Sequence, residues 1–354
     1  MTDDILARYP NVRGNAQAMA LLSGVLTGKN RHGDALALAL AAIRTAPDDM
    51  QVRHMIGDVL SAGVPRFHAP MLHDAARNRA YVSAIEAAVR PGMLVLEIGT
   101  GAGLLALVAA RAGARVVTCE ANPAVAAAAR EIVARNGYAD RITVVAKQSD
   151  GLSVGDELDR PADLLVSEIF GDTLFGEGIV AAIADAKARL LKPGAPILPP
   201  RAELRCALVD ALARPRSAPL NDVEGFDLSP FELLARPIGR RIRAEQNQPV
   251  VVRSPAHSAL AVDFDTAKPF GRTRETVVLE STGGRVDAVA LWMRIDFGGG
   301  IVLESDPFTL PASHWTAPLF DLPAPIETVP GERIDVAVNV TIARVTVNAR
   351  RQST

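Results

Sequence analysis

The middle of the chain alternates short apolar runs with helical segments, and this alternation limits the fold more than any other feature. Four runs have the length and apolar character of buried strands: LVLEIG (94–99), RVVTCE (115–120), ITVVAK (142–147) and ADLLVSEI (162–169). Helical segments separate or follow them, and two of these segments end at Gly113 and Gly137. Alternating strands and helices predict an α/β fold, a doubly wound Rossmann-like domain over residues 63–198.

The segment before this domain has a helical pattern. In residues 1–62, Ala and Leu recur at three and four positions, which predicts helices. Ala35, Ala42 and Pro47 stand where a tetratricopeptide repeat has its small packing residues and its closing proline. An amphipathic helical pair without that ancestry explains the pattern equally well.

The segment after it, residues 199–354, is rich in β-forming runs such as ELRCALVDA, RETVVLEST, AVALWMRIDF and RIDVAVNVTIARVTV. It predicts an antiparallel β-barrel domain. Residues 213–240 are polar and punctuated by proline, so we expect them to leave the barrel as an excursion.

Charge and cysteine content narrow the functional classes. The net charge is −2 and the basic residues are scattered, so nothing points to a nucleic-acid partner. No apolar run approaches the roughly 18 residues of a membrane span, and the start, MTDDILARYP, is acidic where a signal peptide is basic. Cys119 and Cys206 lie far apart without framework spacing, which fits a reducing compartment. We therefore expect a cytoplasmic protein with no membrane partner.

The run EIGTGAG connects the first predicted strand to a helix. Gly99, Gly101 and Gly103 let the backbone approach a ligand, and the helix N-terminus offers free N–H groups. Glu120 ends the second strand, where a carboxylate accepts hydrogen bonds from a ribose. NAD, S-adenosylmethionine and a purely structural turn all fit. Glu97 and the Gly-x-Gly-x-Gly order favour S-adenosylmethionine, which has no pyrophosphate to cradle.

The segment HAPMLHDAARNRAY, which begins at His68, carries a cluster of polar residues. Four of them share one face of a helix that starts near Pro70, because they are three or four positions apart: Asp74, Arg77, Asn78 and Tyr81. That face is either a solvated surface, which the sequence alone favours, or a polar cover over a ligand. His68 and His73 are five positions apart, a poor spacing for joint metal ligation, so we expect no metal site.

Two carboxylates, Glu168 and Glu177, lie nine positions apart in the run SEIFGDTLFGEG. This run follows the fourth predicted strand at its carboxyl end, where doubly wound sheets bind ligands. The pair is either two solvent-facing loop charges or a clamp for a cation. A guanidinium is the cation that two carboxylates match in a bidentate manner.

Together these pieces resemble the protein arginine methyltransferases over about residues 64–354. The pieces that match, in order, are His68-x-x-Met71-Leu72-x-Asp74-x-x-Arg77-x-x-x-Tyr81, the GTGAG loop, Glu120, the paired glutamates and Ser313-His314-Trp315, where the family usually has Thr-His-Trp. Asn78, Phe170 and the GEG ending are most similar to the monomethylating branch of that family.

The resemblance implies a cofactor and the residues that bind it. S-adenosylmethionine would lie on the sheet with its amino-acid end held by Arg77. His68 and Met71 would cover it, and Glu120 would take the ribose. The loop residues named above, from Glu97 to Gly103, complete the expected cofactor site.

The resemblance also implies a reaction. Glu168 and Glu177 would hold the guanidinium of a protein or peptide arginine while its nitrogen attacks the methyl group. His314 and Asp74 would meet across the domain boundary and serve the departing proton. Phe170 and Trp315 are expected to contact the substrate.

Several departures from the family pattern keep other functions open. The aromatic motif before His68 is reduced to VPRF, Ser313 replaces threonine, and the loop aromatic is shifted to Phe170, which allows a small guanidino compound as substrate. A methyltransferase for another nucleophile and a non-catalytic binding scaffold are further alternatives. Residues 213–240 lie where the family inserts a helical arm that docks on a partner, which predicts a head-to-tail homodimer.

Overall fold

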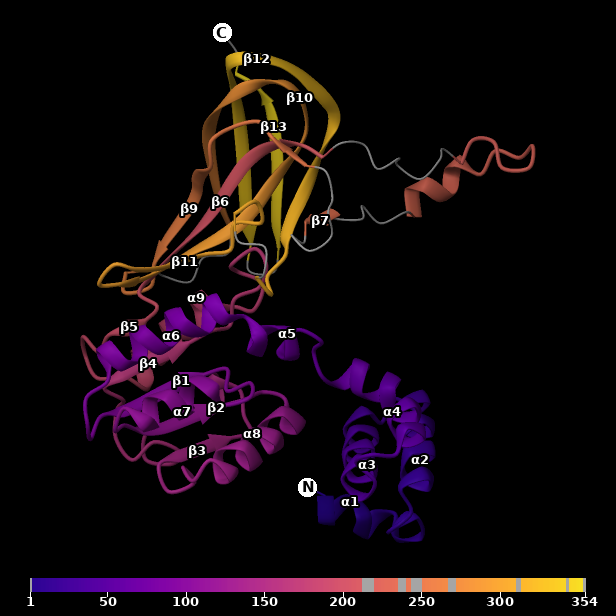
Figure 1. The fold of residues 1–354 in the computed structure, drawn as a ribbon, viewed down its shortest axis with the longest axis vertical. Helices are drawn as coiled ribbons and strands as arrows, with labels where there is room; N and C mark the ends of the chain where they lie inside the picture. The colour runs from indigo at the N-terminus through magenta and orange to yellow at the C-terminus, as the bar shows by residue number, and fades with distance from the viewer. Residues whose placement is uncertain are drawn as a thin grey trace.

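The chain folds into three successive parts: an N-terminal bundle of helices, a parallel sheet with its helices, and an antiparallel sheet (Figure 1). The computed structural model describes residues 2–211, 220–234, 240–242, 250–266, 272–309, 313–341 and 344–352. Figure 1 shows the antiparallel sheet stacked on the parallel part, with the helical bundle beside the latter.

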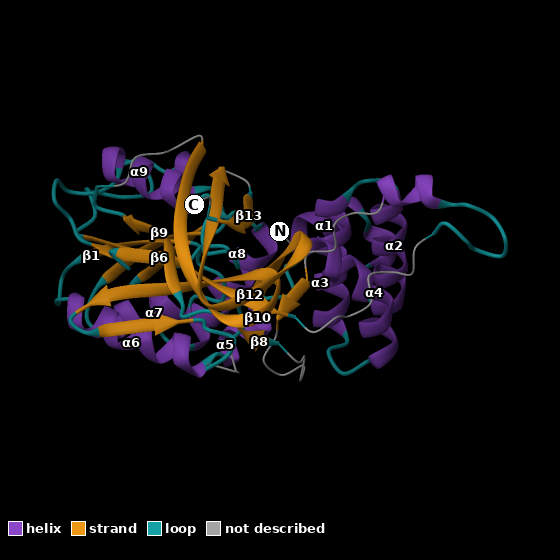
Figure 2. Cartoon of the chain, turned by 90° about the horizontal axis from the view of Figure 1, so that it is seen from above, coloured by secondary structure: helices purple, strands orange, loops and turns teal. Residues whose placement is uncertain are grey.

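The bundle consists of helices α1 (Thr2–Arg8), α2 (Ala16–Gly28), α3 (His32–Thr45) and α4 (Met50–Gly63). Asn15 and Asp49 cap α2 and α4 by accepting hydrogen bonds from the first backbone N–H groups. The buried side chains of this part form a hydrophobic cluster of their own, which includes Ala35 and Ala42. The helices agree with the sequence prediction, and Figure 2 shows them gathered at one side of the two sheets. Their relation to tetratricopeptide repeats stays a prediction.

The parallel sheet has five strands in the order β3-β2-β1-β4-β5. The strands are β1 (Leu94–Ile98), β2 (Arg115–Cys119), β3 (Ile142–Val145), β4 (Leu164–Ser167) and β5 (Ile197–Leu198), and the later helices are α7 (Leu104–Arg111), α8 (Pro123–Arg135) and α9 (Ile179–Arg189). Gly113 and Gly137 adopt left-handed φ angles of 102° and 77° just beyond α7 and α8, as predicted. The order reverses between β1 and β4, and ligands bind at such a point.

The polar segment after residue 67 differs from the single helix that the sequence predicts. It forms α5 (His68–His73) and α6 (Ala75–Ala88), which are separated at Asp74. The Asp74 carboxylate caps α6 by accepting a 2.9 Å hydrogen bond from the Arg77 backbone N–H. The favoured interpretation of a solvated face is wrong, because Asp74 is only 3% exposed and Arg77 only 2%. The antiparallel part and the loop after β4 cover this face.

The antiparallel sheet has the strand order β13-β12-β10-β6-β8, with β11 on β10, β7 on β12 and β9 on β6. Its strands are β6 (Arg201–Asp210), β7 (Arg240–Ile242), β8 (Val251–Val252), β9 (His257–Asp263), β10 (Arg272–Gly298), β11 (Ile301–Glu304), β12 (Ala317–Thr341) and β13 (Val345–Arg351). No described pairing closes it, so the predicted barrel stays a prediction.

Two of the β-forming runs belong to one long strand. RETVVLEST and AVALWMRIDF both lie in β10. Gly283 and Gly284, which divide them, take φ angles of 92° and 93°, and a Cβ on Gly283 would lie 2.9 Å from Pro330. The glycine pair therefore bends the strand against its neighbour without ending it.

The predicted excursion at 213–240 falls partly outside the described residues. Its described residues are 220–234, which contain the 3₁₀ helix η3 (Ser229–Leu234) and project away from the sheet in Figure 1, and Arg240, which lies in β7. Phe226, Leu228 and Phe231 in it are 69%, 46% and 66% exposed. Among the helices that the structure describes, none is long and apolar enough to cross a membrane.

The parallel and antiparallel parts share one hydrophobic core. A single cluster of buried side chains runs from the parallel sheet into β6, β10 and β12. Tyr81 of α6 meets Phe297 of β10 edge to face, with ring centroids 4.7 Å apart. The predicted domain limits, 62/63 and 198/199, fall one residue before the end of α4 and at the end of β5. The shared core fixes the antiparallel part against the carboxyl edge of the parallel sheet.

Candidate active site

A cavity of about 670 Å³ opens at the carboxyl edge of the parallel sheet. Nine of the predicted site residues line it: His68, Met71, Arg77, Glu97, Gly99, Gly101, Glu120, Glu168 and Glu177. The reversal of strand order brings them together, because Ile98 at the end of β1 pairs in register with Ser167 at the end of β4. The two loops that follow these strands therefore start side by side.

The glycine loop after β1 is fixed against β2. The backbone N–H groups of Gly99 and Thr100 both donate to the Cys119 carbonyl, at 3.0 Å each. The Glu120 carboxylate accepts hydrogen bonds from the backbone N–H of Gly101 at 3.0 Å and of Asn122 at 2.9 Å. Glu120 therefore faces the cavity with each oxygen engaged once, which leaves lone pairs for further donors.

Helix α5 covers this loop from above. A Cβ on Gly101 would lie 3.7 Å from the Met71 Cε and 3.8 Å from the His68 Nδ1. Burial lowers the pKa of His68, although the nearby Glu120 charge acts in the opposite direction. These contacts place His68 and Met71 next to the glycine loop, and their role in covering a cofactor stays a prediction.

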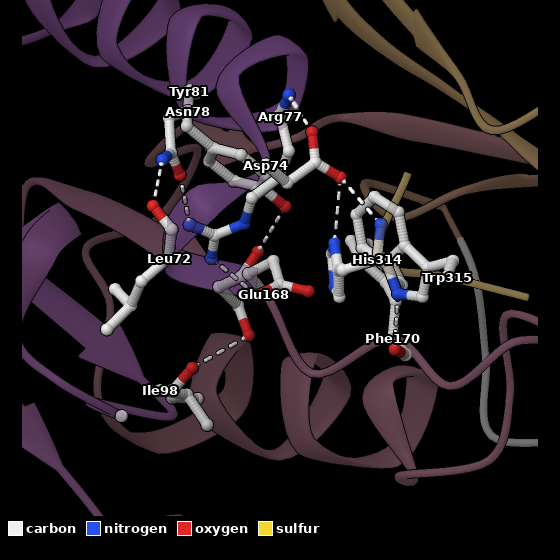
Figure 3. A network of polar contacts seen from close by, with 12 residues as sticks. Leu72, Asp74, Arg77, Asn78, Tyr81, Ile98, Glu168, Phe170, His314 and Trp315 are labelled. Carbon is white, nitrogen blue, oxygen red and sulfur yellow. Dashed lines mark hydrogen bonds and ion pairs between the residues drawn. The ribbon is translucent and has the colours of Figure 1, made fainter. Parts of the chain in front are cut away.

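Arg77 and Glu168 form an ion pair at the back of the cavity (Figure 3). The Arg77 Nη2 lies 2.5 Å from the Glu168 Oε2, and the two side chains are 3% and 5% exposed. Arg77 also donates from Nη1 to the Asn78 Oδ1 at 2.9 Å, and its guanidinium lies 5.2 Å from the Tyr81 ring centroid. Burial raises the pKa of Glu168, and the Arg77 charge offsets part of that rise.

Three buried polar groups of the cavity have no hydrogen-bond partner among the described residues. They are the Arg77 Nε, the His68 Nδ1 and both oxygens of Glu97. Burial raises the pKa of the Glu97 carboxyl to about 8, even though Thr118 and the Ala106 backbone lie close enough to lower it in part. Buried polar atoms without partners are costly, so these groups indicate a ligand with charges of both signs.

Glu177 lies at the exposed mouth of the cavity. The loop that carries it folds back on itself: Leu174 N–H donates to the Gly171 carbonyl at 2.8 Å, and a Cβ on Gly171 would lie 3.2 Å from the Gly176 Cα. Partial burial raises the pKa of Glu177, and the Glu168 charge adds to the rise. The two glutamates are thus electrostatically coupled across the same cavity.

The remaining predicted residues do not line the cavity. The His314 Nδ1 lies 2.9 Å from the Asp74 Oδ2, and the Trp315 Nε1–H donates to the Phe170 carbonyl at 3.0 Å (Figure 3). Asp74 and His314 meet across the domain boundary, which is the contact that the resemblance implies. Phe170 and Trp315 are buried, and Gly103 is the N-cap residue of α7. Their roles as substrate or cofactor contacts stay predictions.

Part of the cavity lining is not among the residues predicted from the sequence. It includes residues 147–150 after β3, Asn122, and Ala181, Ala182 and Asp185 of α9. The end of β3 lies on the same edge of the sheet as β1 and β2, so the strand order alone predicts its participation. The α9 residues carry no comparable signal.

Comparison with known proteins assigns the chain to a family. The family model for ribosomal protein L11 methyltransferase (PrmA) matches residues 78–198. An arginine N(omega)-methyltransferase of Streptomyces achromogenes subsp. streptozoticus is 34% identical over 305 residues, which are 84% of this chain and 82% of that protein. A protein arginine N-methyltransferase 7 of Oryza sativa subsp. indica is 34% identical over 260 residues, which are 67% of this chain and 36% of that protein. The chain thus spans little more than a third of this second relative.

Solved structures agree on the fold. The Trypanosoma brucei PRMT1 enzyme-prozyme complex with AdoHcy has a TM-score of 0.70 at 24% identity, and the match covers 82% of this chain and 94% of that one. A match of this length extends over both the parallel and the antiparallel parts of the chain. With the Streptomyces relative covered over most of both lengths, the chain belongs to the protein arginine methyltransferase family.

Proposed function

We propose that this protein transfers a methyl group from S-adenosylmethionine to a guanidino nitrogen of arginine. The observation that carries the proposal is that Glu168 and Glu177, from one loop, line the same cavity as the glycine loop after β1. One loop thus offers two carboxylates to a cation beside a nucleoside-type site.

The unpaired groups of the cavity fit the cofactor. The free Nε of Arg77 suits the methionine carboxylate, and the Glu97 oxygens suit the ammonium group. Glu120 has lone pairs left for the ribose hydroxyls, with His68 and Met71 above the loop. When bound, S-adenosylmethionine supplies an electrophilic methyl group on a sulfonium.

The Glu97 assignment predicts that cofactor binding releases a proton. Because burial raises the pKa of Glu97 to about 8, the free protein holds this carboxyl mostly protonated at pH 7. An ammonium beside it favours the carboxylate, so binding at pH 7, where the amino group of the cofactor is already largely protonated, is expected to release close to one proton. Calorimetric titration in two buffers of different ionisation enthalpy measures this number. Equal heats at pH 7, or unchanged release by Glu97→Gln, would contradict the assignment.

The protein must make a poor nucleophile react. An arginine guanidinium has a pKa of roughly 12.5 to 13.8 and is a cation. Glu168 and Glu177 draw its charge toward one nitrogen and orient the other for in-line attack. Such positioning contributes on the order of 7–11 kcal/mol of barrier reduction in favourable cases.

The departing proton needs an acceptor. In the proposed mechanism His314 accepts it late, and Asp74 fixes the ring by binding Nδ1, which leaves Nε2 as the acceptor. Asp74 also accepts a 3.0 Å hydrogen bond from the His314 backbone N–H, so one carboxylate holds both the ring and the chain. Because neither residue lines the cavity, proton transfer through His314 stays a prediction.

Methyl transfer from labelled S-adenosylmethionine tests the function. The substrates are an arginine-containing peptide, its lysine counterpart and free L-arginine. Label in the arginine peptide and none in the lysine peptide supports the proposal. Transfer to the lysine peptide alone would favour the alternative nucleophile, and cofactor binding without any transfer would favour the scaffold.

A small guanidino compound is the second candidate substrate. The relative that covers most of both chains is named an arginine, not a protein arginine, N(omega)-methyltransferase. The reduced VPRF motif before His68 points the same way. A higher kcat/KM for free L-arginine than for the arginine peptide would favour this candidate.

The similarity to proteins named protein arginine N-methyltransferase 7 and the GEG ending of the loop support the addition of a single methyl group.

We also propose that the protein is cytoplasmic, which the two unpaired, buried thiols of Cys119 and Cys206 support. The N-terminal helices, in this proposal, are tetratricopeptide-like and stack on the catalytic part.

We also propose a homodimer formed by the excursion at 213–240. Its exposed Phe226, Leu228 and Phe231 need a covering surface, which a second copy supplies. Light scattering at micromolar concentration is expected to give twice the chain mass of 37.4 kDa, and Phe231→Ser to shift the mass toward one chain. A wild-type monomer would refute this assembly.

A further inference from the structure

The loop between β4 and α9 carries Glu168 and Glu177, and hydrogen bonds attach it to the antiparallel part. Trp315, at the start of the segment that leads into β12, donates from its ring to the Phe170 carbonyl. Its neighbour Thr316 makes two bonds to Asp172: its backbone N–H donates to Oδ1 at 3.0 Å and its hydroxyl to Oδ2 at 2.5 Å. Thr316 is only 6% exposed.

These bonds hold the loop at its bend. Asp172 lies between the two ends of the Gly171–Leu174 bridge, and the Gly171 and Gly176 backbones pack directly on each other. A residue fixed at this bend therefore sets the path of the chain to Glu177. Leu174 and Phe175 are buried on the far side of the bend, which limits how the loop can adjust.

Glu177 has no other support. It accepts no hydrogen bond from the residues that the structure describes, whereas Glu168 is fixed by Arg77. The distance between the two carboxylates thus depends on the loop backbone, which Asp172 attaches to Thr316 through two hydrogen bonds.

We propose that Asp172 is a positioning residue that binds Thr316 through both carboxylate oxygens and thereby holds Glu177 opposite Glu168. The inference rests on the proposed function and adds a residue that belongs to none of the motifs named above. Asp172 acts through the loop and does not need to touch the substrate.

The test compares Asp172→Ala with Asp172→Asn. Asparagine can still accept from the Thr316 N–H and donate to its hydroxyl, whereas alanine removes both bonds. We expect Asp172→Ala to lower kcat by about 10- to 100-fold, as a misplacement of about 1 Å does, and to leave cofactor Kd within about twofold. Asp172→Asn is expected to retain activity within about threefold. Thr316→Val, which removes only the hydroxyl, is expected to fall between them.

Hydrogen exchange of residues 169–178 supplies a readout without turnover. Faster exchange in Asp172→Ala than in wild type or Asp172→Asn supports the inference. Equal exchange and kcat in all three would overturn it. Equal losses of kcat in Asp172→Ala and Asp172→Asn would also overturn it, because the charge would then be the cause. A parallel loss of cofactor affinity would mean a general structural role and overturn it too.

The wild-type assay separates this inference from the proposed function. If the wild type methylates no arginine substrate, the proposed function fails and a role for Asp172 in that reaction fails with it. The exchange measurement still decides whether Asp172 holds the loop.

Discussion

Replacing Glu168 with glutamine is expected to lower kcat by about 10²- to 10³-fold, the range seen when one preorganised electrostatic group is lost. Glutamine keeps the size of the side chain and can still accept a hydrogen bond from Arg77. It removes the charge that would draw the guanidinium toward one nitrogen. Substrate KM is expected to rise less than kcat falls, because the effect is largest in the transition state.

The same substitution affects stability. Arg77 and Glu168 are a buried pair, and removal of one charge leaves the other without its counterion. Such losses cost about 3–5 kcal/mol, and the hydrogen bond that glutamine retains places this variant toward the lower end. Thermal unfolding and circular dichroism establish that the variant is folded at the assay temperature.

Glu86→Gln is the matched control for Glu168→Gln. Glu86 also binds an arginine, Arg111, at 2.7 Å, but both side chains are about half exposed. Exposed pairs contribute only about 0–1 kcal/mol, so kcat and melting temperature are expected to stay close to wild type. A folded Glu168→Gln with wild-type kcat would refute the role of Glu168.

Replacing Gly99 with alanine is expected to abolish cofactor binding at concentrations that saturate the wild type. Gly99 has a φ of 89°, and a Cβ there would lie 2.5 Å from the Ile169 Cγ2. The left-handed backbone costs a non-glycine residue about 1–2 kcal/mol, and the overlap adds about 1–3 kcal/mol. Ile169 is stiff and adjoins Glu168, so relief of the overlap would disturb both halves of the site.

Gly137→Ala separates the overlap from the backbone strain. Gly137 has a similar φ of 77° but no atom within 4 Å of the position that a Cβ would take. Both variants should lose about 1–2 kcal/mol of stability, because alanine is strained in a left-handed backbone. Only Gly99→Ala should also lose cofactor affinity in calorimetric titration. Comparable affinities in the two variants would show that the contact between Gly99 and Ile169 does not shape the site.

Much of the cofactor half of the site could be predicted from the sequence because its determinants are local. A glycine loop must follow a strand, and an acidic residue must end the next one, so Gly99, Gly101 and Glu120 are recognisable from their neighbours in the chain. The strand pairing then places the loop after β4 beside them.

The remainder depends on contacts between distant segments. The burial of Asp74 and Arg77 arises from elements more than 90 and up to 240 positions away, Glu168 and His314, and no helical pattern encodes that separation. For the same reason, the sequence alone favours a solvated surface for the helix face that carries Asp74 and Arg77. The close approach of Gly283 in β10 to Pro330 in β12 likewise joins residues that are distant in the chain.

The Asp172–Thr316 contact is a stronger case of the same limit. Its partners are 144 positions apart, and neither residue type is distinctive in a loop. Only the structure shows that the carboxylate is used twice by one threonine.

Tandem mass spectrometry of the methylated product shows which atom of the substrate receives the methyl group. Wild-type protein, S-adenosylmethionine and an arginine peptide are incubated, and the product is fragmented to place the methyl group. We expect one added methyl on a terminal guanidino nitrogen of arginine, formed at close to the wild-type rate by Glu86→Gln and about 10²- to 10³-fold more slowly by Glu168→Gln. A methyl group on any other atom, or an equal rate with Glu168→Gln, would contradict this expectation.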